Sequence, residues 1–129
     1  QVNEIKFTID SILKFATFIR NIYIITDNQT PSFLKENERK DKYGNVKIVD
    51  HKTIFKDYED YLPTFNNRPI ETCMHRIPDM SEHFIYFNDD FFLINQTKPE
   101  DFFKNGMPIL RGKWLKFSED KFKNKFLRN

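Results

Sequence analysis

One hydrophobic run, residues 84–93, constrains the fold of this chain more than any other feature of the sequence. Apolar and aromatic residues of high β-propensity lead into Asp89 and Asp90, and further apolar residues follow them. Two carboxylates buried there without partners would be costly, so they should meet a cation or a set of hydrogen-bond donors. We therefore expect residues 84–88 to form a buried strand whose carboxyl end carries a polar site.

The composition is typical of one globular domain. The 129 residues suffice for a single core, and 15 Phe supply much of the apolar area to fill it. With only 3 Gly the sequence contains no glycine-rich phosphate loop, and the single Cys73 excludes a disulfide framework and a thiolate zinc site. A reducing, cytoplasmic location is the simplest expectation. No apolar run approaches the roughly 20 residues that span a bilayer.

Positive charge is concentrated in residues 111–129, which hold seven Lys or Arg against two acidic residues. Such a segment is either a solvated helix or a contact for an anionic surface, so peripheral attachment to the inner face of a membrane is the functional alternative. Nucleic-acid binding is not expected, because the basic residues do not extend into the rest of the chain. We expect an α/β portion over residues 1–110 and a basic, helical extension over residues 111–129.

Helix and strand patterns alternate along the first 110 residues. Helices are predicted at 4–19, 67–77 and 99–103, strands at 21–26, 46–49 and 84–88, and an extended segment at 107–110. This alternation predicts an α/β layered domain with a mainly parallel sheet. Asp27, Asp50 and Asp89 follow three of the strands, and ligands bind at the carboxyl edge of such sheets.

The predicted helix over residues 67–77 divides into an apolar face and a face that carries Glu71, His75 and Arg76. A carboxylate, an imidazole and a guanidinium are suited to general acid–base chemistry and to holding a phosphate. Glu71 and His75 are i,i+4 neighbours and can pair directly. The alternative is structural: a surface Glu–His pair, an Arg76 paired with a nearby carboxylate, and aspartates that cap a turn.

Several blocks of this sequence carry a family likeness. They read SILKFA at 11–16, IYIITDNQ at 22–29, IVDH at 48–51, LPTFN at 62–66, IE at 70–71, HRIP at 75–78, FIYFNDD at 84–90 and PEDFF at 99–103. Together they resemble the Stealth family of sugar-phosphate transferases, which includes bacterial capsular polysaccharide phosphotransferases and the animal N-acetylglucosamine-1-phosphotransferase. The likeness covers most of residues 3–110. Earlier and later conserved segments of that family are not found in this sequence, so we expect the second conserved block of a larger protein, inactive in isolation.

The resemblance implies a partial Rossmann-like, nucleotide-sugar transferase fold. It also implies transfer of a hexose 1-phosphate from a UDP-sugar to a saccharide hydroxyl, with a phosphodiester and UMP as products. Under this hypothesis Asp90, with Asp89, binds Mg²⁺ or Mn²⁺, Arg76 holds the phosphate, and either Glu71 or His75 takes the acceptor proton. The residues expected to line the nucleotide pocket are Asp27, Asn66 and Asn88.

Two other functions stay open at this point. A metal-dependent glycosyltransferase of similar architecture would break the C1–O bond of the sugar and release UDP. A non-catalytic structural or acceptor-binding fragment would bind neither metal nor UDP. His51 and His83 are expected to be structural or solvated.

Overall fold

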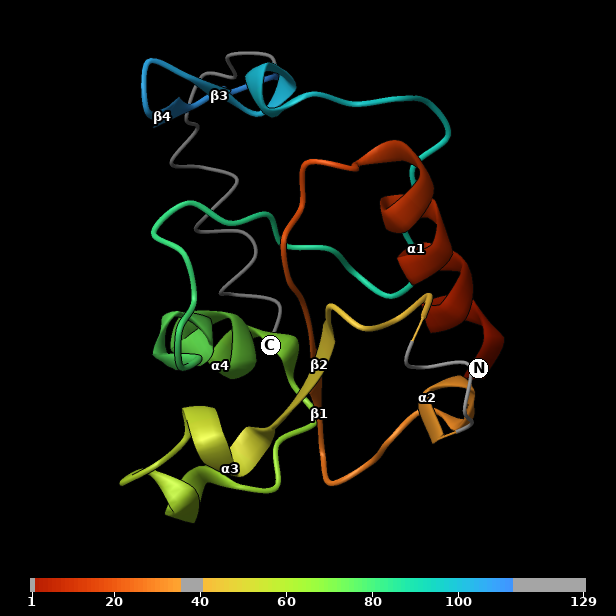
Figure 1. Cartoon of the computed structure of the whole chain (residues 1–129). Coiled ribbons are helices and arrows are strands. Elements are labelled where there is room, and N and C mark those ends of the chain that lie inside the picture. Colours follow the sequence, from red (N-terminus) through yellow and green to blue (C-terminus); the bar gives the residue numbers. More distant parts are fainter. Residues whose placement is uncertain (1, 36–40, 113–129) are drawn as a thin grey trace, which may run out of the picture. The chain divides into compact units, whose positions relative to one another are not determined.

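A computed structural model describes residues 2–35 and 41–112 of the chain (Figure 1). Two compact units are present, Gln1–Lys98 and a second unit that begins at Pro99. Most of the predicted basic extension, residues 113–129, lies outside the described residues. Within the described part, no helix is both long and apolar enough to cross a membrane.

The first unit contains eight of the elements that the structure defines. They are α1 (Val2–Phe15), β1 (Ile22–Thr26), α2 (Ser32–Lys35), β2 (Val46–Asp50), α3 (His51–Ile54), η2 (Glu59–Tyr61), α4 (Asn67–Cys73) and η3 (Met74–Arg76). The second unit contains η4 (Pro99–Asp101), β3 (Phe103–Lys104) and β4 (Met107–Pro108). The chain is therefore mixed α/β, as the sequence predicts.

Strands β1 and β2 form a parallel pair in register from Ile22 opposite Val46 to Thr26 opposite Asp50. Both strands were predicted from the sequence and are confirmed. Their parallel direction requires a crossover connection, and the segment that contains α2 supplies it. In the described residues this sheet has two strands, so the mainly parallel layered sheet of the sequence prediction is present only in part.

Each face of the β1–β2 pair packs against its own hydrophobic cluster. Alternate residues of a strand point to opposite faces, so Ile22 and Ile24 pack with Ile9 of α1 and Leu34 of α2. On the other face, Tyr23 and Ile25 pack against the cluster formed with α3 and η3, whose buried members are Val49, Ile54, Phe55, Met74 and Ile77. The sheet thus separates α1 from α3 and α4 (Figure 1).

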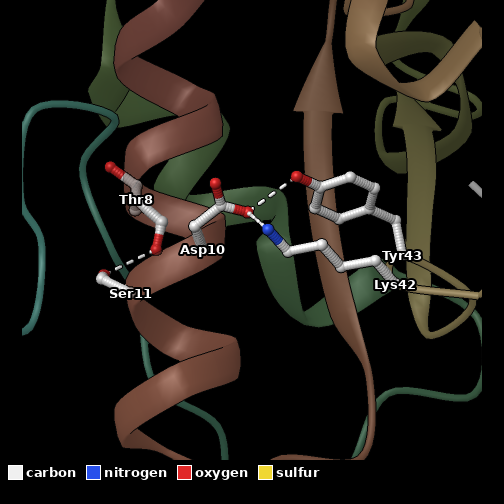
Figure 2. A network of polar contacts seen from close by, with 5 residues as sticks. All are labelled: Thr8, Asp10, Ser11, Lys42 and Tyr43. Atoms are coloured by element: carbon white, nitrogen blue, oxygen red, sulfur yellow. Dashed lines mark hydrogen bonds and ion pairs between the residues drawn. The ribbon is translucent and has the colours of Figure 1, made fainter. Parts of the chain in front are cut away.

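A polar cluster fixes α1 to the chain that enters β2. Figure 2 shows Asp10 of α1 beside Lys42 and Tyr43. The Tyr43 hydroxyl donates a hydrogen bond to Asp10 Oδ1 at 2.7 Å, and Lys42 Nζ lies 3.1 Å from the same oxygen. Tyr43 is only 1% exposed, so its ring belongs to the core while its hydroxyl needs the carboxylate as a partner.

The prediction of a third strand at residues 84–88 is wrong, because this segment belongs to no helix or strand of the structure. Its burial still alternates, because Phe84 and Tyr86 are exposed whereas Ile85 and Phe87 are half-buried. High β-propensity describes side chains that suit a pleated surface, but a strand also needs a neighbouring backbone to complete its hydrogen bonds. In the described part of the chain no strand pairs with residues 84–88.

Side chains of α1 hold the segment that follows. The hydroxyl of Thr8 donates to the carbonyl oxygens of Asp89 at 3.0 Å and Phe91 at 2.6 Å, and Ser11 Oγ accepts from the Leu93 amide at 3.0 Å. Asp89 and Asp90 therefore lie in a turn beside a helix rather than at the end of a strand, which corrects the sequence prediction.

Two predicted helices end earlier than their hydrophobic periodicity indicates. α1 stops at Phe15 rather than residue 19, before a turn of β-branched and aromatic residues with low helix propensity. α4 begins as predicted, capped by the side chain of Asn66, but it changes at Met74 into the tighter 3₁₀ helix η3.

In the second unit a 3₁₀ turn and a hairpin replace the predicted helix at 99–103. Asn105 and Gly106 adopt the positive φ angles of a two-residue hairpin loop.

Candidate functional site

The carboxyl edge of the sheet brings Asp27 and Asp50 together as the sequence predicts, but the two residues differ in their partners. Asp50 Oδ2 accepts a hydrogen bond from the Asn28 amide at 2.7 Å, and Oδ1 accepts from the Lys52 amide at 2.8 Å. Asp50 therefore caps α3 and ties the end of β1 to the end of β2. Asp27 is exposed, so its carboxylate is the one at this edge that can reach a ligand.

Glu71 lies on the exposed side of α4. The helix is positioned by Asn66, whose Oδ1 accepts from the Arg68 amide at 3.0 Å. Asn66 was predicted to line a nucleotide pocket, and in this structure its side chain is used as a helix cap. That cap sets where α4 begins and hence which way Glu71 faces.

Tyr86 joins Glu71 to the acidic turn. The pKa of the Tyr86 hydroxyl is raised by its partial burial, by the charge of the Glu71 carboxylate and a hydrogen bond with it, and by the charge of Asp89. Each negative charge makes a tyrosinate at this position less favourable. The structure thus brings Glu71 and Asp89 around one hydroxyl, although they are 18 residues apart in the sequence.

The turn that carries the adjacent carboxylates is closed by a hydrogen bond from the Phe91 amide to the Asn88 carbonyl at 3.1 Å. Asp89 and Asp90 are both exposed, and Asn88 is half-buried. Within the described residues no third His, Cys, Asp or Glu completes a metal-binding group with them. Two carboxylates still fit Mg²⁺, because this ion commonly binds one or two protein carboxylates and takes its other ligands from water and substrate phosphate.

Arg76 is engaged with the loop that follows α3. Its Nη2 donates to the Lys56 carbonyl at 2.7 Å, and the guanidinium carbon lies 5.1 Å from the centre of the Tyr58 ring. Its Nη1 is buried and has no hydrogen-bond partner in the described part of the chain. Arg76 therefore has a structural role here and one nitrogen without a partner.

His75 is exposed in η3, and in the described structure no hydrogen bond or ion pair joins it to Glu71. The reason is the change of helix type at Met74, because a 3₁₀ helix winds more tightly and turns His75 further round from Glu71. The predicted i,i+4 pairing is therefore not formed.

Sequence reasoning missed Tyr86, whereas His51 was expected to be structural or solvated. The one local signal for Tyr86 was its place in the predicted strand at 84–88, where alternate residues would share a face. His51 is 7% exposed, and its Nδ1 is buried without a partner among the described residues. A hollow of about 230 Å³ at the amino end of β1 is lined by Ile12, Leu13 and Ile22, among others, and lies away from these groups.

Comparison with known proteins places this region in a family. The family description "Stealth protein CR2, conserved region 2" matches residues 1–110. The chain is 46% identical over 106 residues to the capsular polysaccharide phosphotransferase fcs1 of Haemophilus influenzae, which covers 81% of this chain and 27% of the relative.

Two further phosphotransferases also match most of this chain. Identity is 46% over 109 residues with the capsular polysaccharide phosphotransferase LcbA of Neisseria meningitidis, covering 84% of this chain and 28% of the relative. It is 42% over 101 residues with an exopolysaccharide phosphotransferase of Streptomyces coelicolor, covering 78% of this chain and 18% of the relative. The chain thus spans about a quarter of the length of the first two of these relatives. Because the family description matches residues 1–110, this chain belongs to the Stealth family and carries its conserved region 2.

Proposed function

We propose that this chain forms part of the catalytic site of a capsular polysaccharide phosphotransferase that moves a hexose 1-phosphate from a UDP-sugar to a saccharide hydroxyl. The names of its relatives support a phosphotransferase. The exposed carboxylates gathered around Tyr86 support a polar site on the same unit. In this proposal the layered sheet of a nucleotide-sugar transferase is completed only within a larger protein.

The proposed reaction forms one bond and breaks one. The acceptor oxygen attacks the phosphorus that bears the sugar, the bridging P–O bond of the diphosphate breaks, and UMP leaves. The C1–O bond of the sugar stays intact, and the hydroxyl proton passes to a protein base. The site must therefore position the hydroxyl, stabilise the phosphate charge and accept that proton.

Glu71 is the better placed of the two candidate bases. It is exposed, and its charge acts on the neighbouring Tyr86 hydroxyl, whereas no such neighbour is found for His75 among the described residues. Tyr86 can hold one Glu71 oxygen by donating its hydroxyl proton, which leaves the other oxygen for the acceptor hydroxyl. His75 stays in the proposal as the alternative base. Substitution of each residue can show which of the two takes the proton.

Asp89 and Asp90 would hold the divalent cation, which supplies charge neutralisation on the diphosphate when it is bound. The Thr8 hydroxyl orients this turn by binding the carbonyl oxygens of Asp89 and Phe91. Asp27 and Asn88 would line the nucleotide side of the site. Arg76, whose Nη2 binds the Lys56 carbonyl, would hold the phosphate.

The match of residues 1–110 to the Stealth family carries the proposal, and identification of the nucleotide product tests it. The full-length protein is incubated with a UDP-sugar, Mg²⁺ and a saccharide acceptor. We expect UMP and a phosphodiester-linked sugar, and we expect Asp90→Ala to abolish transfer in a folded protein. Release of UDP would show glycosyl transfer instead, and full activity of a folded Asp90→Ala variant would remove this residue from the site.

A further inference from the structure

His51 is a buried histidine that the roles above leave unused. It is the first residue of α3 and directly follows Asp50, the last residue of β2. The side chain is 7% exposed, and Nδ1 is fully buried without a hydrogen-bond partner in the part of the chain that the structure describes. Buried polar atoms normally have partners, so this one calls for an explanation.

The burial of Nδ1 indicates which tautomer the ring adopts. A proton on Nδ1 would be a buried donor without an acceptor, and orphaned N–H groups are rarer in proteins than unpaired acceptors. The neutral ring is therefore expected to carry its proton on Nε2. Of the two ring nitrogens only Nδ1 is both buried and unpartnered, which leaves Nε2 as the nitrogen that can reach a ligand.

The position of His51 suits a donor to substrate. It lies at the carboxyl edge of the parallel pair, where ligands bind in open α/β sheets. Its helix contacts both α4 and η3, the elements that carry Glu71 and Arg76. Asp50 beside it is bound by two backbone amides and is not needed as a partner for the imidazole.

Arg76 in the same region also has a nitrogen without a partner in the described structure. Arg76 Nη1 is buried and unpartnered among the described residues, and η3 packs against α3. Because Nη1 is buried, the His51 Nε2–H group is the donor here that can meet an acceptor oxygen of a ligand. Phosphate oxygens are charged, and they form stronger hydrogen bonds with N–H groups than neutral oxygens do.

We propose that His51 is a substrate-binding residue whose Nε2–H donates a hydrogen bond to a phosphate oxygen of the nucleotide-sugar. The identity of that ligand rests on the proposed function. The role is that of a donor rather than of a proton-accepting base, because the lone pair of the neutral ring is on the buried nitrogen.

The first test reads the tautomer by nitrogen NMR of the labelled chain. Two-bond ¹H–¹⁵N correlations distinguish the two neutral forms, and loss of one signal set in His51→Gln assigns His51 among the histidines. We expect the Nε2–H form, and we expect UDP to shift its signals while uridine does not. The Nδ1–H form would overturn the proposal, as would equal shifts with uridine and UDP.

The second test uses the full-length protein and two matched substitutions. His51→Gln places an amide nitrogen near the position of Nε2, whereas His51→Asn places one near Nδ1. We expect His51→Asn to raise KM for the UDP-sugar about tenfold or more, as loss of a hydrogen bond to a charged group does, and His51→Gln to stay near the wild-type KM. Equal KM values in the two variants, with equal losses in melting temperature, would show a structural role only.

The two proposals fail in different ways. If the nucleotide product is UDP rather than UMP, the transfer reaction proposed above is wrong, while the contact of His51 with the diphosphate is still measured by the same KM comparison. If UMP is formed and His51→Asn behaves like His51→Gln, the transfer reaction stands and the assignment of His51 is overturned.

Discussion

The buried hydroxyl of Tyr43 donates a 2.7 Å hydrogen bond to Asp10 Oδ1 and thereby joins the segment before β2 to α1 (Figure 2). Neither element is close to the other in sequence, so this contact helps to define how the helix lies on the sheet. The Lys42 ammonium binds the same oxygen from the exposed side, with 56% of its side chain in solvent. The buried hydrogen bond and the exposed ion pair should therefore differ in their contribution to stability.

We predict that Asp10→Ala lowers the free energy of unfolding by about 1–3 kcal/mol, because it leaves the buried Tyr43 hydroxyl without an acceptor. Lys42→Gln is the matched control, since it removes only the exposed ion pair and should cost about 0–1 kcal/mol. Urea denaturation of both variants measures the difference. Equal losses would mean that the hydrogen bond to Tyr43 adds nothing beyond the surface charge.

Stability should fall at alkaline pH. The pKa of Tyr43 is raised from its ordinary value of 10.0 by burial first and by the hydrogen bond to Asp10 next. Because the folded chain holds this proton more tightly than the unfolded chain, the stabilisation is complete below about pH 10 and is lost as the pH rises through the higher folded pKa. The pKa of Lys42 is also raised, mainly by its hydrogen bond to Asp10. Deprotonation of Lys42 therefore also lowers stability as the pH rises.

Urea denaturation at pH 8 and at pH 11 tests this dependence. The wild-type chain should lose more free energy of unfolding between these values than Tyr43→Phe, which has no hydroxyl to ionise at that position. An identical pH dependence for the two proteins would show that Tyr43 does not couple ionisation to folding.

Glu71→Gln in the full-length protein should lower sugar-phosphate transfer by about 10²–10⁴-fold, the range for loss of a general base. The melting temperature should be unchanged, because Glu71 is exposed. Glu82→Gln, another exposed glutamate of the same unit, is the control and should keep wild-type activity. If His75→Ala loses transfer while Glu71→Gln keeps it, the base is His75.

Arg76→Ala should destabilise the unit that contains it, apart from any effect on activity. It removes the hydrogen bond to the Lys56 carbonyl and the contact with the Tyr58 ring, together worth about 1–2 kcal/mol at a partly exposed site. Arg68→Ala on the exposed side of α4 should change stability by less than about 0.5 kcal/mol. Thermal denaturation compares the two variants. An unchanged midpoint for Arg76→Ala would show that the contacts of Arg76 with Lys56 and Tyr58 do not stabilise the unit.

The residue types of the candidate site were predicted from the sequence more successfully than the contacts between those residues. The carboxylates at the ends of β1 and β2 follow from local strand patterns, and the cap at Asn66 follows from local turn chemistry. The i,i+4 pairing of Glu71 with His75 fails because the helix changes type at Met74. The engagement of Arg76 with Lys56 could not be predicted, because it depends on how α3 packs against η3.

Local sequence by itself determined the elements whose signals lie within a few residues: the two parallel strands and the start of α4. Local sequence could not decide whether residues 84–88 form a strand. Their β-propensity is high, but a strand forms only when another backbone pairs with it. Tertiary structure decided instead that Thr8 and Ser11 of α1 hold the following turn, and that the charge of Glu71 raises the pKa of Tyr86. These contacts join residues far apart in the chain, so they follow from packing rather than from local preference.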